Sequence, residues 1–140
     1  MNNRFKFRVW DVEQNKFLPS YGNLGIEFYH EQGKNWHEKQ VRDIVPVSWF
    51  LQDHNNNLAN YIVTQYTGLN DKNDKEICEG DILEWKGEFI AEVFFEQENA
   101  AFVSKSKTDG KAFMSENYVL NFQIIGNIFE HKHLLEKQYE

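Results

Sequence analysis

The sequence predicts a mainly β fold, and three of its features support this class. Aromatic residues make up 16% of the chain, and bulky aromatic side chains favour the pleated, half-buried surfaces of sheets. Several short segments alternate apolar and polar residues with the period of two that a strand requires. Turn-forming Gly, Asn and Asp residues separate these segments. The chain has 140 residues, enough for a stable core in one domain or in two small ones.

The first strand is expected at Arg4–Trp10, where side chains alternate between two faces. One face holds Phe5, Phe7 and Val9, and the other holds Arg4, Lys6, Arg8 and Trp10. The second face is expected to be exposed to water or to a partner. Residues 11–16 are expected to turn the chain back through Phe17–Leu18.

Two short extended segments are expected next. One lies at Ile26–Tyr29, after a pair of glycines that break the chain. The other lies around Val41–Val47, because Pro46 argues against a helix through this region. A turn at residues 33–35 separates the two segments.

A polar loop at residues 52–57 is the expected boundary between two parts of the chain. The first part, residues 1–60, is an N-terminal β extension. The second part, residues 61–140, is a small β unit that ends in a helix. The two parts can also form one integrated domain.

A hairpin is the clearest element of the second part. Its strands are Ile82–Lys86 and Phe89–Phe95, and Gly87 lies in the turn between them. An antiparallel pair with a tight glycine turn is expected. The other expected elements are strands at Tyr61–Tyr66, Ala101–Lys105 and Phe122–Phe129, a loop at residues 67–75, a turn at residues 108–111 and a short helix at His131–Tyr139.

The net charge of −7 arises entirely in the second part. Residues 1–60 contain seven Lys or Arg and seven Asp or Glu, whereas residues 61–140 contain eight and fifteen. One stretch has only Lys86 among the acidic residues Glu76, Glu79, Asp81, Glu84, Glu88, Glu92, Glu96 and Glu98. This field repels phosphate and argues against nucleic acid as a partner. A solvated hairpin face explains the stretch, and a basic protein partner or mimicry of nucleic acid are the alternatives.

Cysteine usage and the absence of long apolar runs indicate the cytoplasm. Cys78 is the only cysteine, so no disulfide can form within the chain, and a lone cysteine is typical of a reducing compartment. The first residues lack the apolar run of a signal peptide. No segment approaches the ~20 apolar residues of a membrane span, so no membrane association is expected.

No residue pattern indicates catalysis, a cofactor or a metal. The chain has neither a glycine-rich phosphate loop nor a Cys-x-x-Cys pair. Cys78 lies beside Glu76 and Glu79, whose charges disfavour a reactive thiolate. A metal site would require at least two histidines to lie close together. The candidates, which have glutamates near them in the sequence, are His30, His37, His131 and His133. We therefore expect no enzymatic activity.

Three segments, in order, resemble the motifs of a known protein family. They are Phe5–Asp11 (FKFRVWD), Gln65–Ile82 (QYTGLNDKNDKEICEGDI) and Ile124–Glu130 (IIGNIFE), the last followed by Leu134–Leu135. Together they closely resemble the YopX family of small phage and prophage proteins. The central segment is long and specific. Residues from about 18 to 61 carry no matching motif.

The resemblance implies a mainly β fold with a compact barrel, and a phage or prophage origin in a bacterial cytoplasm. It implies no activity that carries over to particular residues. Asp74 stands where the family usually has glycine, and Asp tolerates a left-handed backbone better than most residues. Cys78 stands where the family commonly has an aromatic residue.

We expect the barrel to be SH3-like and to span residues 61–130. The Gly80-Asp81 start of a strand, followed by a tight hairpin, is how many small barrel modules begin. This is a similarity of fold and indicates little about function. The preceding residues add strands to the barrel, and the short helix ends the chain.

The central motif has a structural and a functional interpretation. In the structural one, Gly68 and Gly80 permit backbone bends that a side chain would obstruct. Asp81 then accepts backbone N–H bonds where its strand begins, and Tyr66 packs with Ile82 across the loop. In the functional one, an exposed recognition patch lies beside the loop. Its members are Arg8, Trp10, Gln65, Thr67 and Asp71.

The expected function is that of a noncatalytic phage or prophage accessory protein that binds a host or phage protein. One alternative is a nucleic-acid-associated regulator that uses Arg4, Lys6 and Arg8. Another is a hydrolase or a metalloenzyme. An outward-pointing aromatic residue such as Trp10 also favours a homo-oligomer, because pairing would cover it.

Overall fold

The computed structural model describes residues 6–18, 20–21, 25–31, 40–46, 61–108 and 110–136. Contacts group the chain into two compact units, which are Phe5–Gln65 and Tyr66–Glu140, the latter together with Met1–Arg4. The division falls inside strand β6 (Tyr61–Asn70). Whether the units are separate domains, with the boundary expected between residues 60 and 61, stays a prediction.

Strands dominate the described residues, which confirms the mainly β class. Within these ranges only α2 (Glu116–Val119) and the 3₁₀ turn η2 (Lys132–Glu136) are helical. The helix expected at His131–Tyr139 is reduced to η2 as far as the chain is described. No residue of η2 is buried, so little packing is available to lengthen it, and short helices depend on such packing.

In the first unit, β1 (Phe7–Asp11) lies between two antiparallel partners. On one side is β2 (Lys16–Phe17), and on the other is the Tyr61–Gln65 part of β6. Asp11 Oδ1 accepts a hydrogen bond of 2.9 Å from Gln14 N–H and so stabilises the turn to β2. The expected strand and its return through residues 17 and 18 are confirmed.

The expectation that Trp10 faces water is wrong. Its exposed fraction is 5%, and Val9 on the other face is completely buried. The Trp10 ring packs edge-on against Phe17, with 4.9 Å between ring centroids. Phe17 is its direct cross-strand partner, and such partners share one face. The alternation along β1 therefore predicted the strand, but it did not predict that Phe17 covers Trp10.

A second antiparallel sheet in this unit has the order β3-β4-β5. Its strands are β3 (Ser20–Tyr21), β4 (Gly25–Glu31) and β5 (Gln40–Pro46). The two expected extended segments are therefore confirmed. Pro46 ends an edge strand, a position that tolerates the missing N–H. The turn expected at residues 33–35 and the polar loop expected at residues 52–57 lie outside the described residues.

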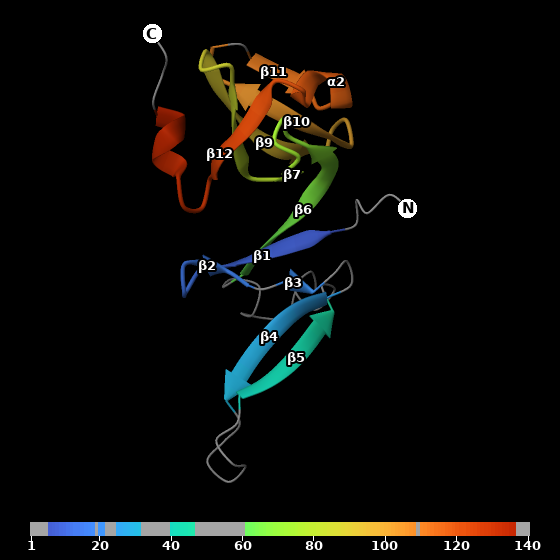
Figure 1. Ribbon diagram of the computed structural model, residues 1–140, viewed down its shortest axis with the longest axis vertical. Helices are drawn as coiled ribbons and strands as arrows, with labels where there is room; N and C mark the ends of the chain where they lie inside the picture. The colour runs from blue at the N-terminus through green and yellow to red at the C-terminus, as the bar shows by residue number, and fades with distance from the viewer. Residues whose placement is uncertain are drawn as a thin grey trace. The chain divides into compact units, whose positions relative to one another are not determined.

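The second unit contains a five-stranded antiparallel sheet with the order β11-β10-β9-β8-β12. This sheet curls into a half-barrel (Figure 1). β12, the last strand in the sequence, pairs with β8, which comes first in the sequence among the strands of this sheet. The strands are β8 (Asp81–Trp85), β9 (Phe89–Glu96), β10 (Ala101–Ser106), β11 (Gly110–Phe113) and β12 (Phe122–Asn127).

The expected hairpin is confirmed. Trp85 pairs with Phe89 and Ile82 with Glu92 in antiparallel register. The turn residues Lys86 and Gly87 have φ values of 48° and 71°, and two consecutive positive φ values are the signature of the type I′ hairpin turn.

The Tyr66–Asn70 part of β6 pairs with β7 (Glu76–Cys78), and the register is irregular between Tyr66 and Asn70. The strand expected to end at Tyr66 thus continues for four more residues. Ile77 from β7 joins a buried cluster on the inner face of the curled sheet. The other buried members are Leu83, Val93, Val119 and Phe122. This cluster is the core on which the site described next is built.

Candidate binding site

The Asp71 side chain holds the central loop together. Its exposed fraction is 6%. Oδ1 accepts hydrogen bonds from the N–H groups of Asn73 (2.8 Å) and Lys75 (2.9 Å). Oδ2 accepts one of 2.9 Å from Ile124 N–H in β12. This carboxylate therefore joins the loop to the outer edge of β12, and it is not displayed for recognition.

The backbone conformations of the motif fit its structural interpretation. Gly68 and Gly80 have φ values of 88° and 89°, in the region that side chains disfavour. Asp74, in the place of the family's glycine, has a φ of 62°, so the left-handed turn is kept. Asp81 is buried and accepts a 2.8 Å bond from Cys78 N–H. These expectations are confirmed.

Thr67 also serves the local structure. Its hydroxyl donates to Ile77 O at 2.8 Å and accepts from Leu69 N–H at 3.1 Å. The half-buried Thr67 thus ties β6 to β7. The neighbouring Tyr66 hydroxyl donates to Asn70 Oδ1.

The expected recognition patch is divided between the two units. Arg8, Trp10 and Gln65 belong to Phe5–Gln65, and Thr67 and Asp71 belong to the other unit. Arg8 Nε donates to Thr64 Oγ1 at 3.1 Å, and its guanidinium lies 4.7 Å from the centre of the Phe17 ring. Trp10 and Asp71 are buried, so the expectation of exposure is wrong for these two. Partner binding by Arg8, Gln65 and Thr67 stays a prediction.

The acidic residues between Glu76 and Glu98 differ in their surroundings. Burial raises the pKa of Glu92, and the nearby Lys132 and Lys105 lower it in part. Hydrogen bonds from Lys111 and Asn99 lower the pKa of the half-buried Glu96. The stretch therefore combines a structural carboxylate, Asp81, with partly neutralised and solvated ones.

Among the described side chains, no three His, Cys, Asp or Glu residues are grouped so that they could hold a metal ion. His131 Nδ1 accepts a hydrogen bond of 3.2 Å from Asn127 N–H. Its ring centre lies 6.4 Å from that of His133. The side chains of His30 and His37 lie outside the described residues.

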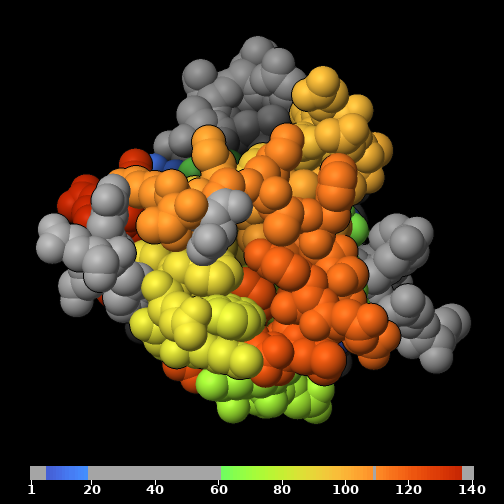
Figure 2. Space-filling view, turned by 90° about the horizontal axis from the view of Figure 1, so that it is seen from above, coloured from blue at the N-terminus to red at the C-terminus, as the bar shows by residue number. Residues whose placement is uncertain are grey.

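A pocket of about 480 Å³ opens on the second unit. It lies where the β8–β9 turn, shown in yellow, meets α2 and the start of β12, shown in orange to red (Figure 2). The pocket is lined by Trp85, Phe89, Ser106, Gly110, Ala112, Asn117, Tyr118, Asn121 and Phe122.

Cross-strand pairing explains why there is a hollow at this place. Phe89, Trp85 and Phe122 are successive partners across β9, β8 and β12, so their large rings share one face. On the same face, at the opposite end of the sheet, Ser106 of β10 pairs with Gly110 of β11. Ala112, two residues farther along β11, is also small. Large rings on three strands thus face small side chains on two strands, which leaves space between them.

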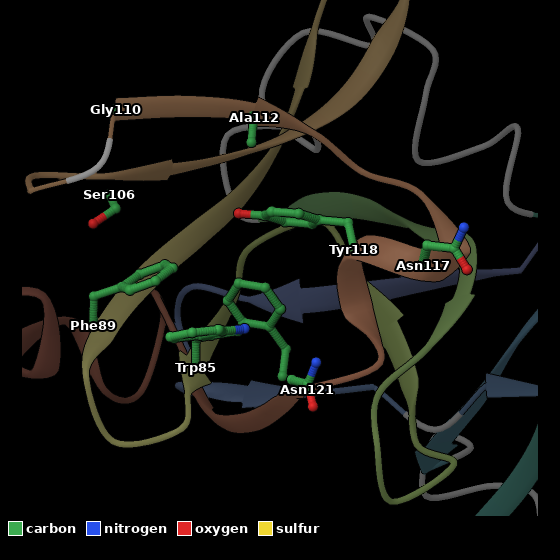
Figure 3. A pocket seen from close by; sticks show the side chains of 9 residues that line it. Trp85, Phe89, Ser106, Gly110, Ala112, Asn117, Tyr118 and Asn121 are labelled. Carbon is green, nitrogen blue, oxygen red and sulfur yellow. The ribbon is translucent and has the colours of Figure 1, made fainter.

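The aromatic wall is preorganised by contacts among its own rings. Trp85 and Phe89 are stacked with centroids 5.5 Å apart, and Phe89 meets Phe122 edge-on at 5.8 Å. Tyr118 from α2 packs on Phe122 at 4.9 Å. The Tyr118 hydroxyl is fixed by a 2.8 Å bond with Ser104 Oγ. Figure 3 shows Trp85, Phe89 and Tyr118 around one space, with Ser106 and Asn121 at opposite ends.

The polar groups of the pocket are neutral. Among the described residues that line the pocket, none carries a charged side chain, although the Lys86 ammonium lies 4.7 Å from the centre of the Trp85 ring. The indole N–H of Trp85 and the amides of Asn117 and Asn121 have no acceptor within the described part of the chain. Both asparagines are exposed. The site therefore combines flat apolar surface with a few hydrogen-bond donors, the usual composition of a ligand pocket.

Sequence reasoning missed this pocket because it missed α2. Ser115 caps that helix, its Oγ accepting from Tyr118 N–H at 3.2 Å. A serine before Glu116 is a recognised helix-start signal. It would have placed Tyr118 on a helix, but it could not have predicted which strands Tyr118 faces.

The comparisons with known proteins bear on the whole chain. Residues 6–136 match the model of the family described as YopX protein. The chain belongs to the YopX family. This YopX chain is similar to a crystal structure of protein EF1440 from Enterococcus faecalis, with 25% identity and a TM-score of 0.57. That match covers 93% of the YopX chain and 96% of the other. The search of curated proteins found no match. Within the described part of this YopX chain, no helix is long and apolar enough to cross a membrane.

Proposed function

We propose that the protein is a noncatalytic phage or prophage accessory protein of the bacterial cytoplasm, which binds a host or phage protein through the aromatic pocket. The observation that carries this proposal is the pocket itself, with a preorganised aromatic wall and hydrogen-bond donors that no described group satisfies. Exposed aromatic surface combined with unpaired donors is typical of recognition sites.

The architecture around the pocket supports an SH3-like barrel. The sheet has its last strand, β12, beside its first, β8, and ends at β11 on the other side. A one-turn helix, α2, directly precedes the last strand. We take this order as support for an SH3-like barrel, a class in which aromatic-lined grooves can bind peptides. The fold makes such a role reasonable, whereas the site is what argues for it.

A pull-down from the bacterial host tests the proposal when it compares two leucine substitutions in β11. Ala112→Leu fills the pocket, since Ala112 lines it. Phe113→Leu changes the next residue, which points to the other face and is 58% exposed. We expect the wild type and Phe113→Leu to retain the same protein and Ala112→Leu to lose it.

Melting temperatures of both variants show whether each is folded. Capture of no protein, or equal capture by a folded Ala112→Leu variant, would contradict the proposal.

Self-association is a separate part of the proposal. Trp10 no longer supports it, because this ring is buried. Phe113 and Leu120 remain exposed, at 58% and 60%, and pairing would remove such side chains from water. Light scattering at micromolar concentration should therefore give a mass above 16.7 kDa. A monomeric mass would remove self-association and leave the binding proposal standing.

A further inference from the structure

We infer that the pocket binds a proline-containing segment of the partner protein in the polyproline II conformation. This inference rests on the proposed function and names the chemistry that the site would recognise. It depends on four properties of the pocket, which are its size, its aromatic wall, its unpaired donors and the neutral side chains of its described lining residues.

The size of the pocket limits the ligand to a short piece of chain. A volume of about 480 Å³ lies within the range of small-molecule pockets, roughly 300–1,000 Å³. A helix or a sheet face would not enter such a space. An extended segment can insert one or two side chains while the rest of it passes over the rim.

The aromatic wall favours a rigid apolar ring as the inserted group. Trp85, Phe89 and Tyr118 present flat surfaces that are already fixed by ring contacts and by the Ser104 hydroxyl. A pyrrolidine ring packs flat on such surfaces. Because proline already fixes φ, a polyproline II segment loses little conformational entropy on binding. Leu or Met would fill the same space, but they would lose more rotamer freedom.

The unpaired donors suit the backbone of this conformation. A polyproline II segment makes no internal hydrogen bonds, so its carbonyl oxygens need donors when water is removed. Trp85 Nε1 and the amide groups of Asn117 and Asn121 can supply them. In Figure 3 the indole nitrogen of Trp85 lies on the side of the ring toward Asn121. Donors and ring surface are thus available to a single segment.

Charge selects against acidic ligands. The described lining residues include no cation that could bind a phosphate or a carboxylate, and the Lys86 ammonium beside them already lies over the Trp85 ring. Residues 61–140 contain fifteen Asp or Glu against eight Lys or Arg. The residues that directly adjoin the lining residues in the sequence include bases, such as Lys86 and Lys111, as well as the acids Glu88 and Glu116, so the negative field comes from the unit as a whole. A neutral proline core flanked by Lys or Arg therefore complements this unit, and the same field disfavours single-stranded nucleic acid, which also stacks on aromatic rings.

The test uses the full chain and two sets of synthetic peptides of about ten residues. The first set has a Pro-x-x-Pro core with varied intervening residues and Lys at both ends. In the second set every Pro is replaced by Ala. Calorimetric titration should show binding by members of the first set and at least about tenfold weaker binding by their alanine counterparts. Ala112→Leu should weaken binding at least tenfold, and Phe113→Leu should leave it unchanged.

A second variant covers the case in which Ala112→Leu does not fold. Asn117→Ala combined with Asn121→Ala removes two exposed amides and leaves the core intact. It should melt like the wild type and bind the proline peptides about threefold to tenfold more weakly. Its binding curve then tests whether the amides contribute donors to the ligand.

Three results would overturn the inference. They are no binding by any proline peptide to folded wild type, equal binding by the alanine set, and pocket-dependent binding of a thymidine oligonucleotide in place of the peptides. If the host pull-down nevertheless yields a pocket-dependent protein that the proline peptides do not displace, the proposed function stands and only the proline ligand is rejected.

Discussion

The central loop and the aromatic pocket lie in the same unit, but they differ in whether their polar groups have hydrogen-bond partners within the chain. In the loop the Asp71 carboxylate and the Thr67 hydroxyl bond to backbone groups of the chain, and so does the Asp81 carboxylate where β8 begins. In the pocket, the Trp85 indole N–H and the amides of Asn117 and Asn121 have no acceptor in the described residues. A polar group satisfied internally contributes to the fold, whereas an unsatisfied one is available to a ligand.

This difference separates the motif that characterises the sequence from the surface that we propose for recognition. The long central motif specifies turns, strand pairing and the attachment of β12. The pocket draws its residues from six elements, which are the five strands from β8 to β12 and α2, with Asn121 between α2 and β12, and these residues form no continuous motif. Mutations in the two regions should therefore have opposite effects on stability and on binding.

Asp71→Ala should give the largest loss of stability. It removes the acceptor of three backbone N–H groups, including that of Ile124 in β12. We expect a cost of about 2–4 kcal/mol, because three hydrogen bonds to one carboxylate are lost together and the half-buried Ile124 N–H is left without its partner. Chemical denaturation measures it. The matched control is Asn73→Ala in the same exposed loop, which should stay within about 0.5 kcal/mol of wild type.

Gly68→Val and Gly80→Val should be the next most destabilising changes. Their φ values of 88° and 89° are strained for a β-branched residue, and we expect about 1–3 kcal/mol for each. Thermal melting of both variants provides the test. Wild-type melting in both would mean that the loop tolerates side chains and would remove the structural interpretation of these glycines.

Asn117→Ala and Asn121→Ala should change stability by less than about 0.5 kcal/mol each, since both side chains are exposed. The same substitutions should reduce capture of the partner. A drop in melting temperature comparable with that of Gly80→Val would show that these amides support the fold, and the contrast between the two regions would then disappear.

Glu92→Gln should have the smallest effect, and it should depend on pH. Burial raises the pKa of Glu92, so the folded state binds the proton more tightly than the unfolded state does. The wild type then loses stability as the pH rises through the folded pKa. The glutamine variant should be more stable at pH 7 by less than about 0.5 kcal/mol, since the carboxylate stays partly hydrated. The gap should close below a pH of about 4.

Chemical denaturation of wild type and Glu92→Gln, at pH 7 and at a pH below about 4, measures this difference in the free energy of unfolding. A glutamine variant that is less stable than wild type at pH 7 would reverse the sign and would mean that the attraction of Lys132 and Lys105 exceeds the cost of burial.

Local features of the sequence predicted local structure well. The hairpin followed from Gly87 between two β-rich runs, and the left-handed turn at Asp74 followed from the tolerance of Asp. The burial of Trp10 did not follow, because it depends on which residue of β2 lies opposite. The pocket was also beyond reach. It arises from the pairing of small residues in β10 and β11 beside large ones in β8, β9 and β12, and one sequence does not reveal such pairings.

The bond from Ile124 N–H to Asp71 has a consequence for how the protein folds as it is synthesised. Its two residues are 53 positions apart in the chain, and the neighbouring bond from Lys72 N–H to Phe122 O spans a similar distance. While the ribosome is still making β9 to β11, Oδ2 of Asp71 cannot yet accept its hydrogen bond from Ile124 N–H. At this stage β8 also lacks its neighbour β12. Closing such distant contacts is entropically costly and slow. The C-terminal unit must therefore wait for its last strand, and it completes folding only after β12 has left the exit tunnel.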